Sequence, residues 1–397
     1  MGLRFGFLST YPPTQCGIAT FAESLVRHLH RSGAHVGVVR LVDEPEVQVL
    51  PVVHQWVRGR RGAEIDAALV LDDFDVAVVQ HEYGIFGGPD GEDVLDVVQR
   101  LSVPVITVLH TVLTNPTPNQ HRVLAALVDR SAALVTMTET ARDRLVAGWG
   151  VDPATVTVIP HGAEDNRTDH PSPLAAVPQR PTLLTWGLLS EGKGIEWALL
   201  ALAELRETTE LPRYRVLGRT HPKVLERDGE AYRASLMSMT RHLGLEGHVD
   251  FDSRYLSGPD LRRAVSEADV VVLPYDSPEQ VTSGVLTEAV AAGKPVISTS
   301  FPHAVELLSG GAGILVPQRD PAAIAEALHR LLTVPGLRDH MAREARGLAA
   351  SLLWPAVSQR YIELGRALRG HGRVELSERD LASHGAIALG AELRSAV

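Results

Sequence analysis

The stretch Val270–Thr299, VVVLPYDSPEQVTSGVLTEAVAAGKPVIST, decides how this chain folds. Its first residues, Val270–Leu273, form an apolar run that is too short for a helix and rich in β-branched side chains, as in a strand buried on both faces. Ser283 and Gly284 then precede a helical pattern, since Ser is a favourable N-cap and Gly lets a ligand approach the backbone. The sequence Gly-Lys-Pro ends the helix before a second strand. The stretch therefore predicts a strand–helix–strand unit of a parallel sheet.

The loop before that helix has the features of an anion site. The first N–H groups of a helix lack partners inside it, and the helix dipole is positive there. Ligands of parallel sheets lie beyond the carboxyl ends of the strands, where the loop Asp276–Gly284 falls. Glu288 follows one turn below Gly284, where a carboxylate suits ribose hydroxyls beside a diphosphate. The alternative is an ordinary crossover with a surface glutamate, because short glycine loops give many false positives.

Length and composition indicate a globular protein of two domains. The chain has 397 residues, of which 45% are hydrophobic and 22% are charged. No apolar run approaches the ~20 residues of a membrane helix, and MGLRFGFLSTYPP reads as a first strand rather than a signal peptide. The single cysteine, Cys16, excludes an internal disulfide and favours a cytoplasmic location. The net charge of −10 argues against nucleic acid as a partner and weakens attachment to an anionic membrane.

Short apolar runs alternate with helical patterns in the first part of the chain. The runs expected as strands are Arg4–Ser9, Val36–Leu41, Val76–Val79, Val103–Leu109, Ala132–Thr136 and Val156–Ile159. The segments expected as helices are Ile18–Leu29, Glu92–Leu101, Asn119–Val128 and Thr140–Ala147. This alternation is typical of a doubly wound parallel sheet.

The alternation stops at Glu164–Pro181, which is polar and rich in proline, and then restarts. The second set of expected strands is Leu183–Trp186, Tyr214–Leu217, Val249–Phe251, Val270–Leu273, Val296–Ser298 and Ile314–Val316. The second set of expected helices is Ile195–Leu205, Lys223–Leu243, Ala322–Leu332, Leu337–Ala350 and Trp354–Leu368. We therefore expect an α/β protein with Rossmann-like domains at residues 1–165 and 182–350 facing a cleft, joined by a linker at 166–181. A C-terminal helix at 351–370 and a peripheral tail at 371–397 complete the prediction.

Six motifs, in one order, resemble those of the retaining glycosyltransferases of family 4, which have the GT-B fold. They are PTQCGIATFAESL, VLHT, VTVIPHG, GLLSEGKG, QVTSGVLTE and WPAVSQRYIEL, and the resemblance extends from Arg4 to about Leu368. It implies an acceptor-side first domain, a second domain that binds a nucleotide sugar, and a last helix that crosses back to the first domain. The implied reaction moves a hexose from a nucleotide diphosphate sugar, such as GDP-mannose or a UDP-hexose, to a hydroxyl of a small-molecule, glycan or lipid-linked acceptor, without a cofactor or metal.

Carried over residue by residue, the resemblance assigns the transfer itself to His110, Lys193 and Gln280. Lys193 matches the family's phosphate-binding lysine, and His110 matches the active-site histidine of the VLHT loop. Gln280 takes the place of a sugar-contacting glutamate, and Glu288 takes that of the ribose-contacting one. The full set of donor-side residues implied is Gly17, Gly187, Leu188, Gly218, Arg219, Tyr255, Glu279, Ser283, Gly284, Val285 and Glu288.

Two positions depart from the family pattern. Leu188 stands where the family usually has arginine, and Arg219 is a candidate to supply the missing cation. A glutamine at 280 still binds hydroxyls but adds no negative charge, and the adjacent Glu279 is a candidate to replace it in part. These departures indicate a subtype and leave the donor sugar open.

The remaining candidates each have a structural alternative. His81 and Thr111 are expected on the acceptor side, but histidines such as His81 and His110 can also cap a strand end. His161 is expected to order the domain junction, and Cys16 to be a small loop residue rather than a nucleophile. The basic cluster Arg58, Arg60 and Arg61 reads as a solvated run, and no His/Cys/Asp spacing indicates a metal site.

Two other functions fit the same fold. One is a sugar-nucleotide epimerase or a pseudo-glycosyltransferase that joins carbon to nitrogen, which product analysis with a labelled donor distinguishes. The other is a non-catalytic subunit that binds a nucleotide sugar, in which Leu188 and Gln280 mark lost activity.

Overall fold

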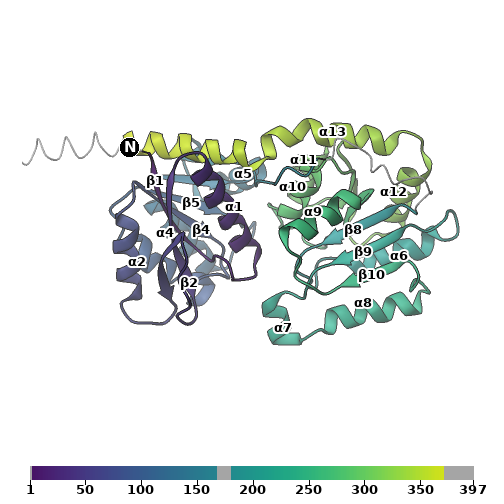
Figure 1. Ribbon diagram of the computed structural model, residues 1–397, viewed down its shortest axis with the longest axis horizontal. Helices are drawn as coiled ribbons and strands as arrows, with labels where there is room; N and C mark the ends of the chain where they lie inside the picture. The colour runs from purple at the N-terminus through teal and green to yellow at the C-terminus, as the bar shows by residue number, and fades with distance from the viewer. Residues whose placement is uncertain (1, 168–179, 371–397) are drawn as a thin grey trace, which may run out of the picture.

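The apolar runs of the first domain form a seven-stranded parallel sheet. The computed structural model describes residues 2–167 and 180–370, which form two lobes (Figure 1). The strands are β1 (Arg4–Ser9), β2 (His35–Val42), β3 (Val52–Val57), β4 (Val76–His81), β5 (Val105–Leu109), β6 (Ala133–Thr136) and β7 (Val156–Val158), in the order β3-β2-β1-β4-β5-β6-β7. The helices are α1 (Gly17–Arg31), α2 (Ala63–Asp72), α3 (Val94–Val98), α4 (Pro118–Arg130) and α5 (Glu139–Trp149), with 3-10 turns at Pro89–Gly91 and Pro153–Thr155.

The second domain repeats this plan with six parallel strands. They are β8 (Thr182–Trp186), β9 (Arg213–Leu217), β10 (Val249–Asp252), β11 (Val270–Leu273), β12 (Val296–Thr299) and β13 (Gly313–Val316), in the order β10-β9-β8-β11-β12-β13. Its helices are α6 (Ile195–Leu205), α7 (Pro222–Asp228), α8 (Ala231–His242), α9 (Gly258–Glu267), α10 (Gly284–Ala291), α11 (Pro302–Leu308), α12 (Pro321–Thr333) and α13 (Leu337–Leu352). The predicted α/β fold with two doubly wound sheets is confirmed.

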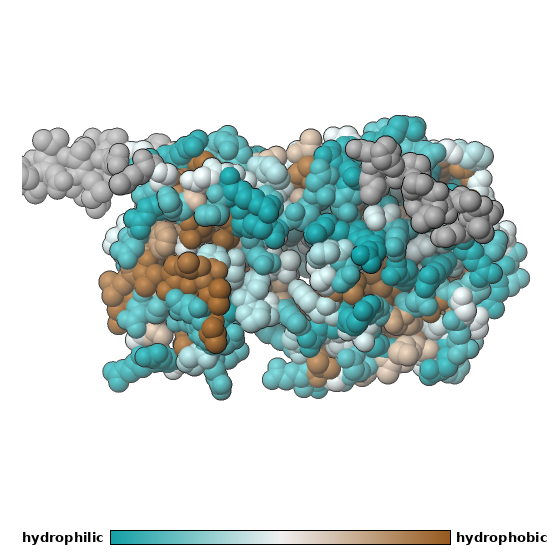
Figure 2. Space-filling model, in the orientation of Figure 1, coloured by the Kyte–Doolittle hydropathy of each residue, from teal (hydrophilic) through white to brown (hydrophobic). Residues whose placement is uncertain are grey.

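The strand order alone indicates where a ligand site should lie. In the first domain the order reverses between β1 and β4, and in the second it reverses between β8 and β11. Loops after neighbouring strands of this kind leave toward opposite faces and open a crevice at the carboxyl edge, which is where open α/β sheets bind ligands. Figure 2 shows a notch between the two lobes on one side of the molecule.

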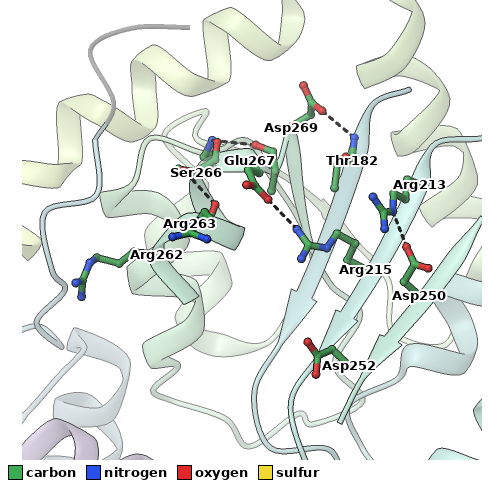
Figure 3. Close-up of polar contacts among 12 residues, drawn as sticks. Thr182, Arg213, Arg215, Asp250, Asp252, Arg262, Arg263, Ser266, Glu267 and Asp269 are labelled. Atoms are coloured by element: carbon green, nitrogen blue, oxygen red, sulfur yellow. Dashed lines mark hydrogen bonds and ion pairs between the residues drawn. The ribbon is translucent and has the colours of Figure 1, made fainter. Parts of the chain in front are cut away.

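The opposite edge of the second sheet is held by structural ion pairs. The backbone N–H of Thr182, at the start of β8, donates to Asp269 Oδ2 at 2.7 Å. Arg213 pairs with Asp250, and Arg215 with Glu267 (Figure 3). These groups fix the strand starts and lie away from the carboxyl edge.

The last helix, residues 354–370, belongs to the first domain by packing. Trp354, Val357, Tyr361 and Ile362 lie in the same buried cluster as β1 and α1. Figure 1 shows this segment, in yellow, running back along the first lobe. The chain thus passes between the lobes at two places, and these lie side by side because Ala163 forms a β-bridge with Leu353.

Three predicted features need correction or extension. The expected helix Lys223–Leu243 is two helices, α7 and α8, because Gly229 takes a φ of +63° that ends α7. Strand β3 and helices α2, α9 and α11 were not expected. The tail 371–397 lies outside the described residues. Among the residues described, no helix is both long enough and apolar enough to span a membrane.

Candidate active site

Two glycine loops of the second domain pack tightly at its carboxyl edge. Gly194 has a φ of +62°, and a Cβ there would collide with the carbonyl oxygen of Pro274. Gly218 has a φ of +127°, and a Cβ there would collide with the backbone of Gly187. Only glycine fits both positions, because other residues disfavour positive φ and no space remains. This packing brings the loops after β8, β9 and β11 together, and with them Lys193.

Lys193 is a half-buried cation between these loops. Its Nζ lies 4.2 Å from the centre of the Tyr275 ring, within range of a cation–π contact. Within residues 2–167 and 180–370, Nζ has no carboxylate partner and no hydrogen bond. Burial lowers the Lys193 pKa from 10.5 to about 8. Because a buried charge without a counter-charge is costly, this lysine favours an anionic ligand.

The start of α10 lies beside the Tyr275 side of this pocket. The Ser283 side chain caps the helix by accepting from Leu286 N–H at 3.2 Å, and Ser283 N–H donates to His303 Nδ1 at 2.8 Å. In the described part of the chain, the N–H groups of Gly284 and Val285 have no hydrogen-bond acceptor. They are therefore donors for an anion, and the helix dipole adds to their effect.

Glu288 lies one helical turn further along α10. Its Oε2 accepts a hydrogen bond from Trp186 Nε1 at 3.3 Å. Removal from water raises the Glu288 pKa to about 7; the Trp186 hydrogen bond opposes this, and nearby Glu164 adds to it. The carboxyl group is thus held beside the last residue of β8. With this pKa it is about half protonated near pH 7.

Gln280 and the adjacent Glu279 make their contacts in different domains. Gln280 Nε2 donates to Thr282 O within its own loop at 3.1 Å. Glu279 instead contacts the first domain, where its carboxylate accepts from Thr114 N–H and from Arg144, both at 2.9 Å. Burial raises the Glu279 pKa, but these hydrogen bonds and the Arg144 charge outweigh it, so the net pKa is lowered. Leu188, in the loop after β8, is half-buried.

His110 lies at the carboxyl end of β5 in the first domain. Its Nε2 is 2.7 Å from Gln80 Oε1, and its ring packs edge-on against Phe21, with ring centres 5.0 Å apart. Burial, together with the nearby His161 and His81, lowers the His110 pKa to about 3. His110 is therefore neutral at physiological pH. Thr111 follows it directly in a half-buried position.

His81 ends β4 and is fully buried. In the part of the chain that the structure describes, neither of its ring nitrogens has a hydrogen-bond partner, and the ring packs edge-on against Tyr83 at 4.9 Å. Burial lowers the His81 pKa to about 4. His81 pairs with Leu109 on the neighbouring strand, so these two side chains point to the same face of the sheet. His110 is the next residue after Leu109, so the side chains of His81 and His110 point to opposite faces.

Several side chains of the second domain reach the first. Arg219 donates to Gln15 Oε1, beside Gly17 at the start of α1. The hydroxyl of Tyr255, a 44% exposed residue, is 3.2 Å from Thr20 Oγ1. The structure therefore holds the two lobes in contact across the donor-side loops.

The remaining candidates have structural partners. His161 Nδ1 lies 2.8 Å from Gly162 O, and its ring packs against Phe21 and Trp354 at the junction of the lobes. Cys16 Sγ caps α1 by accepting from Ala19 N–H at 3.4 Å. Arg58 pairs with Asp43, so it is not simply a solvated charge. In residues 2–167 and 180–370, no three His, Cys, Asp or Glu side chains are grouped to hold a metal ion.

Four residues of the site were not anticipated: Gln80, Arg144, Trp186 and His303. Gln80 directly precedes His81 in the QHEYG segment and meets His110 only because β4 pairs with β5. Trp186 ends β8 and meets Glu288, 102 residues later in the chain. Each contact depends on strand order, and no local motif marks these residues.

Family comparisons agree with this architecture. Residues 16–167 match the family model described as Glycosyltransferase Family 4, and residues 180–334 match that described as Glycosyl transferases group 1. A D-inositol 3-phosphate glycosyltransferase of Corynebacterium diphtheriae is 30% identical, over 59% of this chain and 56% of its own length. A glycogen synthase of Mycobacterium tuberculosis is 29% identical, over 60% of this chain and 55% of its own. The match thus spans little more than half the length of these relatives.

Solved structures share the fold. HepE of Anabaena, in complex with UDP and glucose, has a TM-score of 0.72 at 17% identity, covering 92% of this chain and 100% of that one. Sucrose-phosphate synthase of Thermosynechococcus elongatus also has a TM-score of 0.72 at 17% identity, covering 93% and 100%. The predicted GT-B fold and the resemblance to family 4 are confirmed.

Proposed function

We propose that this chain, which is built from a family 4 and a group 1 glycosyltransferase domain, transfers a hexose from a nucleotide diphosphate sugar to a hydroxyl acceptor. The observation that carries the proposal is Lys193, a half-buried cation that has no carboxylate partner among the described residues and lies between glycine loops near the start of α10. A diphosphate supplies the anion that this pocket lacks. The names of the relatives support glycosyl transfer.

The second domain is proposed to hold the nucleotide. The diphosphate lies between Lys193 Nζ and the N–H groups of Gly284 and Val285, while the Glu288 carboxyl group accepts from ribose hydroxyls. Gln280 and His110 then face the sugar from the two sides of the interface. Neutral His110 acts as a hydrogen-bonding group rather than as a general acid, because its pKa is far below 7.

The transfer is proposed to retain the anomeric configuration by front-face substitution. The bond from the anomeric carbon to the acceptor oxygen forms as the bond to the diphosphate oxygen breaks, and the departing phosphate takes the acceptor proton. Lys193 and the start of α10 stabilise the charge that develops on the diphosphate. No separate base is needed, and the lobe contacts through Arg219 and Tyr255 exclude water from the donor.

Calorimetry with nucleoside diphosphates and nucleotide hexoses tests donor binding, and proton NMR of the product tests retention. We expect tight binding of at least one nucleoside diphosphate and an unchanged anomeric coupling constant in the product. Measuring transfer activity in the presence of a chelator tests the prediction that no metal is required. The cytoplasmic location also stays a prediction. A wild-type protein that binds none of these nucleotides would make the proposed function wrong. A product epimerised at the sugar, or joined through carbon and nitrogen, would favour the rival enzymes.

A further inference from the structure

The loop that carries Gln280 belongs to the second domain by sequence, but one of its residues, Val281, is buried in the first. It connects β11 to α10, yet Val281 is only 2% exposed and lies in a buried cluster whose other members come from the first domain. These members are Leu109, Val112, Leu124, Leu134, Ala141, Leu145, Val151 and Val156. The Val281 carbonyl also accepts from Thr138 Oγ1 at 3.1 Å. The loop therefore packs against the first domain through Val281.

Arg144, on α5, joins this loop to the loop that carries His110. One nitrogen, NH1, donates to Val112 O at 3.2 Å, two residues after His110. The same nitrogen donates to the Glu279 backbone oxygen at 3.3 Å and to its carboxylate at 2.9 Å. The Glu279 carboxylate in turn accepts from Thr114 N–H at 2.9 Å.

We propose that Arg144, with Val281, is a positioning residue that clamps the His110 loop and the Gln280 loop in register across the two lobes. This inference rests on the proposed function, since it concerns how the sugar end of the donor is held. Gln280 lies between two anchored neighbours, Glu279 and Val281, so its position is set by the first domain. The groups proposed to bind the nucleotide, Lys193 and Glu288, have no part in the clamp.

The clamp predicts a specific split between binding and turnover. Arg144→Ala frees the Gln280 loop from the His110 loop, so transfer should slow roughly 10- to 100-fold, because a ~1 Å misplacement can cost ~100-fold. Affinity for a nucleoside diphosphate should stay within about twofold of wild type, since the nucleotide is held by the second domain. Hydrolysis of the donor by water should rise relative to transfer.

The matched control is Arg142→Ala on the same helix. Arg142 pairs with Glu139, three residues earlier on α5, and forms no hydrogen bond or ion pair with a described residue of the second domain. This variant should keep wild-type turnover. Arg144→Lys should recover only part of the activity, because a lysine cannot reproduce the planar guanidinium geometry.

A double-mutant cycle with Glu279→Ala distinguishes the clamp from a direct donor contact. If Arg144 acts through Glu279, the two single variants and the double variant should lose similar transfer activity. Additive losses would mean that Glu279 acts on the donor independently, and they would overturn the clamp. Wild-type turnover in Arg144→Ala would also overturn the clamp. Equal losses of nucleotide affinity and of turnover, together with a lower Tm, would overturn it too, because they would show a general loss of structure. A wild-type protein that binds no nucleotide would overturn the proposed function and the clamp with it.

Discussion

The side-chain oxygen Oε1 of Gln80 lies 2.7 Å from Nε2 of His110, at the carboxyl ends of two adjacent strands. A carbonyl oxygen only accepts, so Nε2 carries the ring hydrogen and Nδ1 is left as an acceptor. Gln80 is fully buried, and its own Nε2 has no partner in the described residues. The pair therefore sets the tautomer of the histidine that we propose to face the sugar.

Gln80→Glu should raise the His110 pKa. Burial now holds that pKa at about 3, and a carboxylate beside the ring should raise it by about 1–3. The variant should therefore lose transfer activity as pH falls toward 6, while the wild type does not. The pH profile of kcat/KM and an NMR titration of the ring measure both effects. Gln99→Glu, at an exposed position in the same domain, is the control. Identical profiles in wild type and Gln80→Glu would separate Gln80 from the reaction.

Lys193→Met should stabilise the ligand-free protein while slowing transfer. Burial lowers the lysine pKa to about 8, so between about pH 8 and 10.5 the unfolded chain binds more protons and wild-type stability rises with pH. The variant should gain roughly 1–3 kcal/mol at pH 7, and this gain should fade between about pH 8 and 10.5. Turnover should fall about 100- to 1,000-fold, more than donor affinity.

The matched control is Lys294→Met. Its Nζ donates to Ser266 O at 2.7 Å and to Ala268 O at 2.9 Å, so its loss should lower the Tm. Thermal unfolding and steady-state kinetics measure both variants. A Lys193→Met protein with a lower Tm and normal turnover would assign the lysine to folding instead.

Glu288→Gln should make stability less dependent on pH. The native pKa of about 7 lies above the ordinary value of 4.5, so the native state binds more protons than the unfolded state between these values. The stabilising contribution of protonated Glu288 is present below pH 4.5 and is lost as pH rises through 7. At pH 8 the variant should be roughly 1–3 kcal/mol more stable than wild type, and at pH 4.5 about equal. Denaturant unfolding at both pH values measures this difference.

The same variant should weaken nucleotide binding at pH 8. A charge-assisted hydrogen bond to ribose is worth ~1.5–3 kcal/mol, or roughly 10- to 150-fold in affinity. Calorimetry with the preferred nucleoside diphosphate measures it. Unchanged affinity would remove Glu288 from the nucleotide site even if the stability result holds.

Gln280→Glu should change the ranking of donor sugars and leave free nucleotide binding as before. An amide both donates and accepts, whereas a carboxylate only accepts, so the preferred hydroxyl pattern should change. Mispaired buried groups cost ~1–3 kcal/mol each. A competition assay with several hexoses on one nucleotide measures the ranking. The same ranking and rates in both proteins would show that residue 280 does not face the sugar.

The parts of the fold that local sequence determines were predictable. Arg4–Ser9, Ile195–Leu205 and Val270–Leu273 form elements with those bounds, because each is a continuous apolar run or a clear helical period. Helix α2 was not predicted because it has no single apolar face: Ile65 is 47% exposed and Leu69 is 64% exposed. Strand β3 is an edge strand, where burial imposes little pattern.

The candidate site divides in the same way. Lys193 and Glu288 could be named because each lies in a motif that is visible in the local sequence, GLLSEGKG and QVTSGVLTE. Gln80 and Arg144 act through partners that are 30 and 135 residues away, so their roles follow only from strand pairing and from the contact between lobes. A single sequence carries no local signal for such pairs.

The packing of the last helix into the first domain has a consequence for biosynthesis. The cluster around Phe5 and Phe7 lacks the side chains of Trp354 and Tyr361 until the ribosome has made almost the whole chain. At about 5–20 residues per second, the nearly 200 residues that follow the first domain take roughly 10–40 s to synthesise. During that interval the apolar surface that these aromatic rings later cover is available to chaperones. The first domain, although it emerges first, is therefore the last to complete its core.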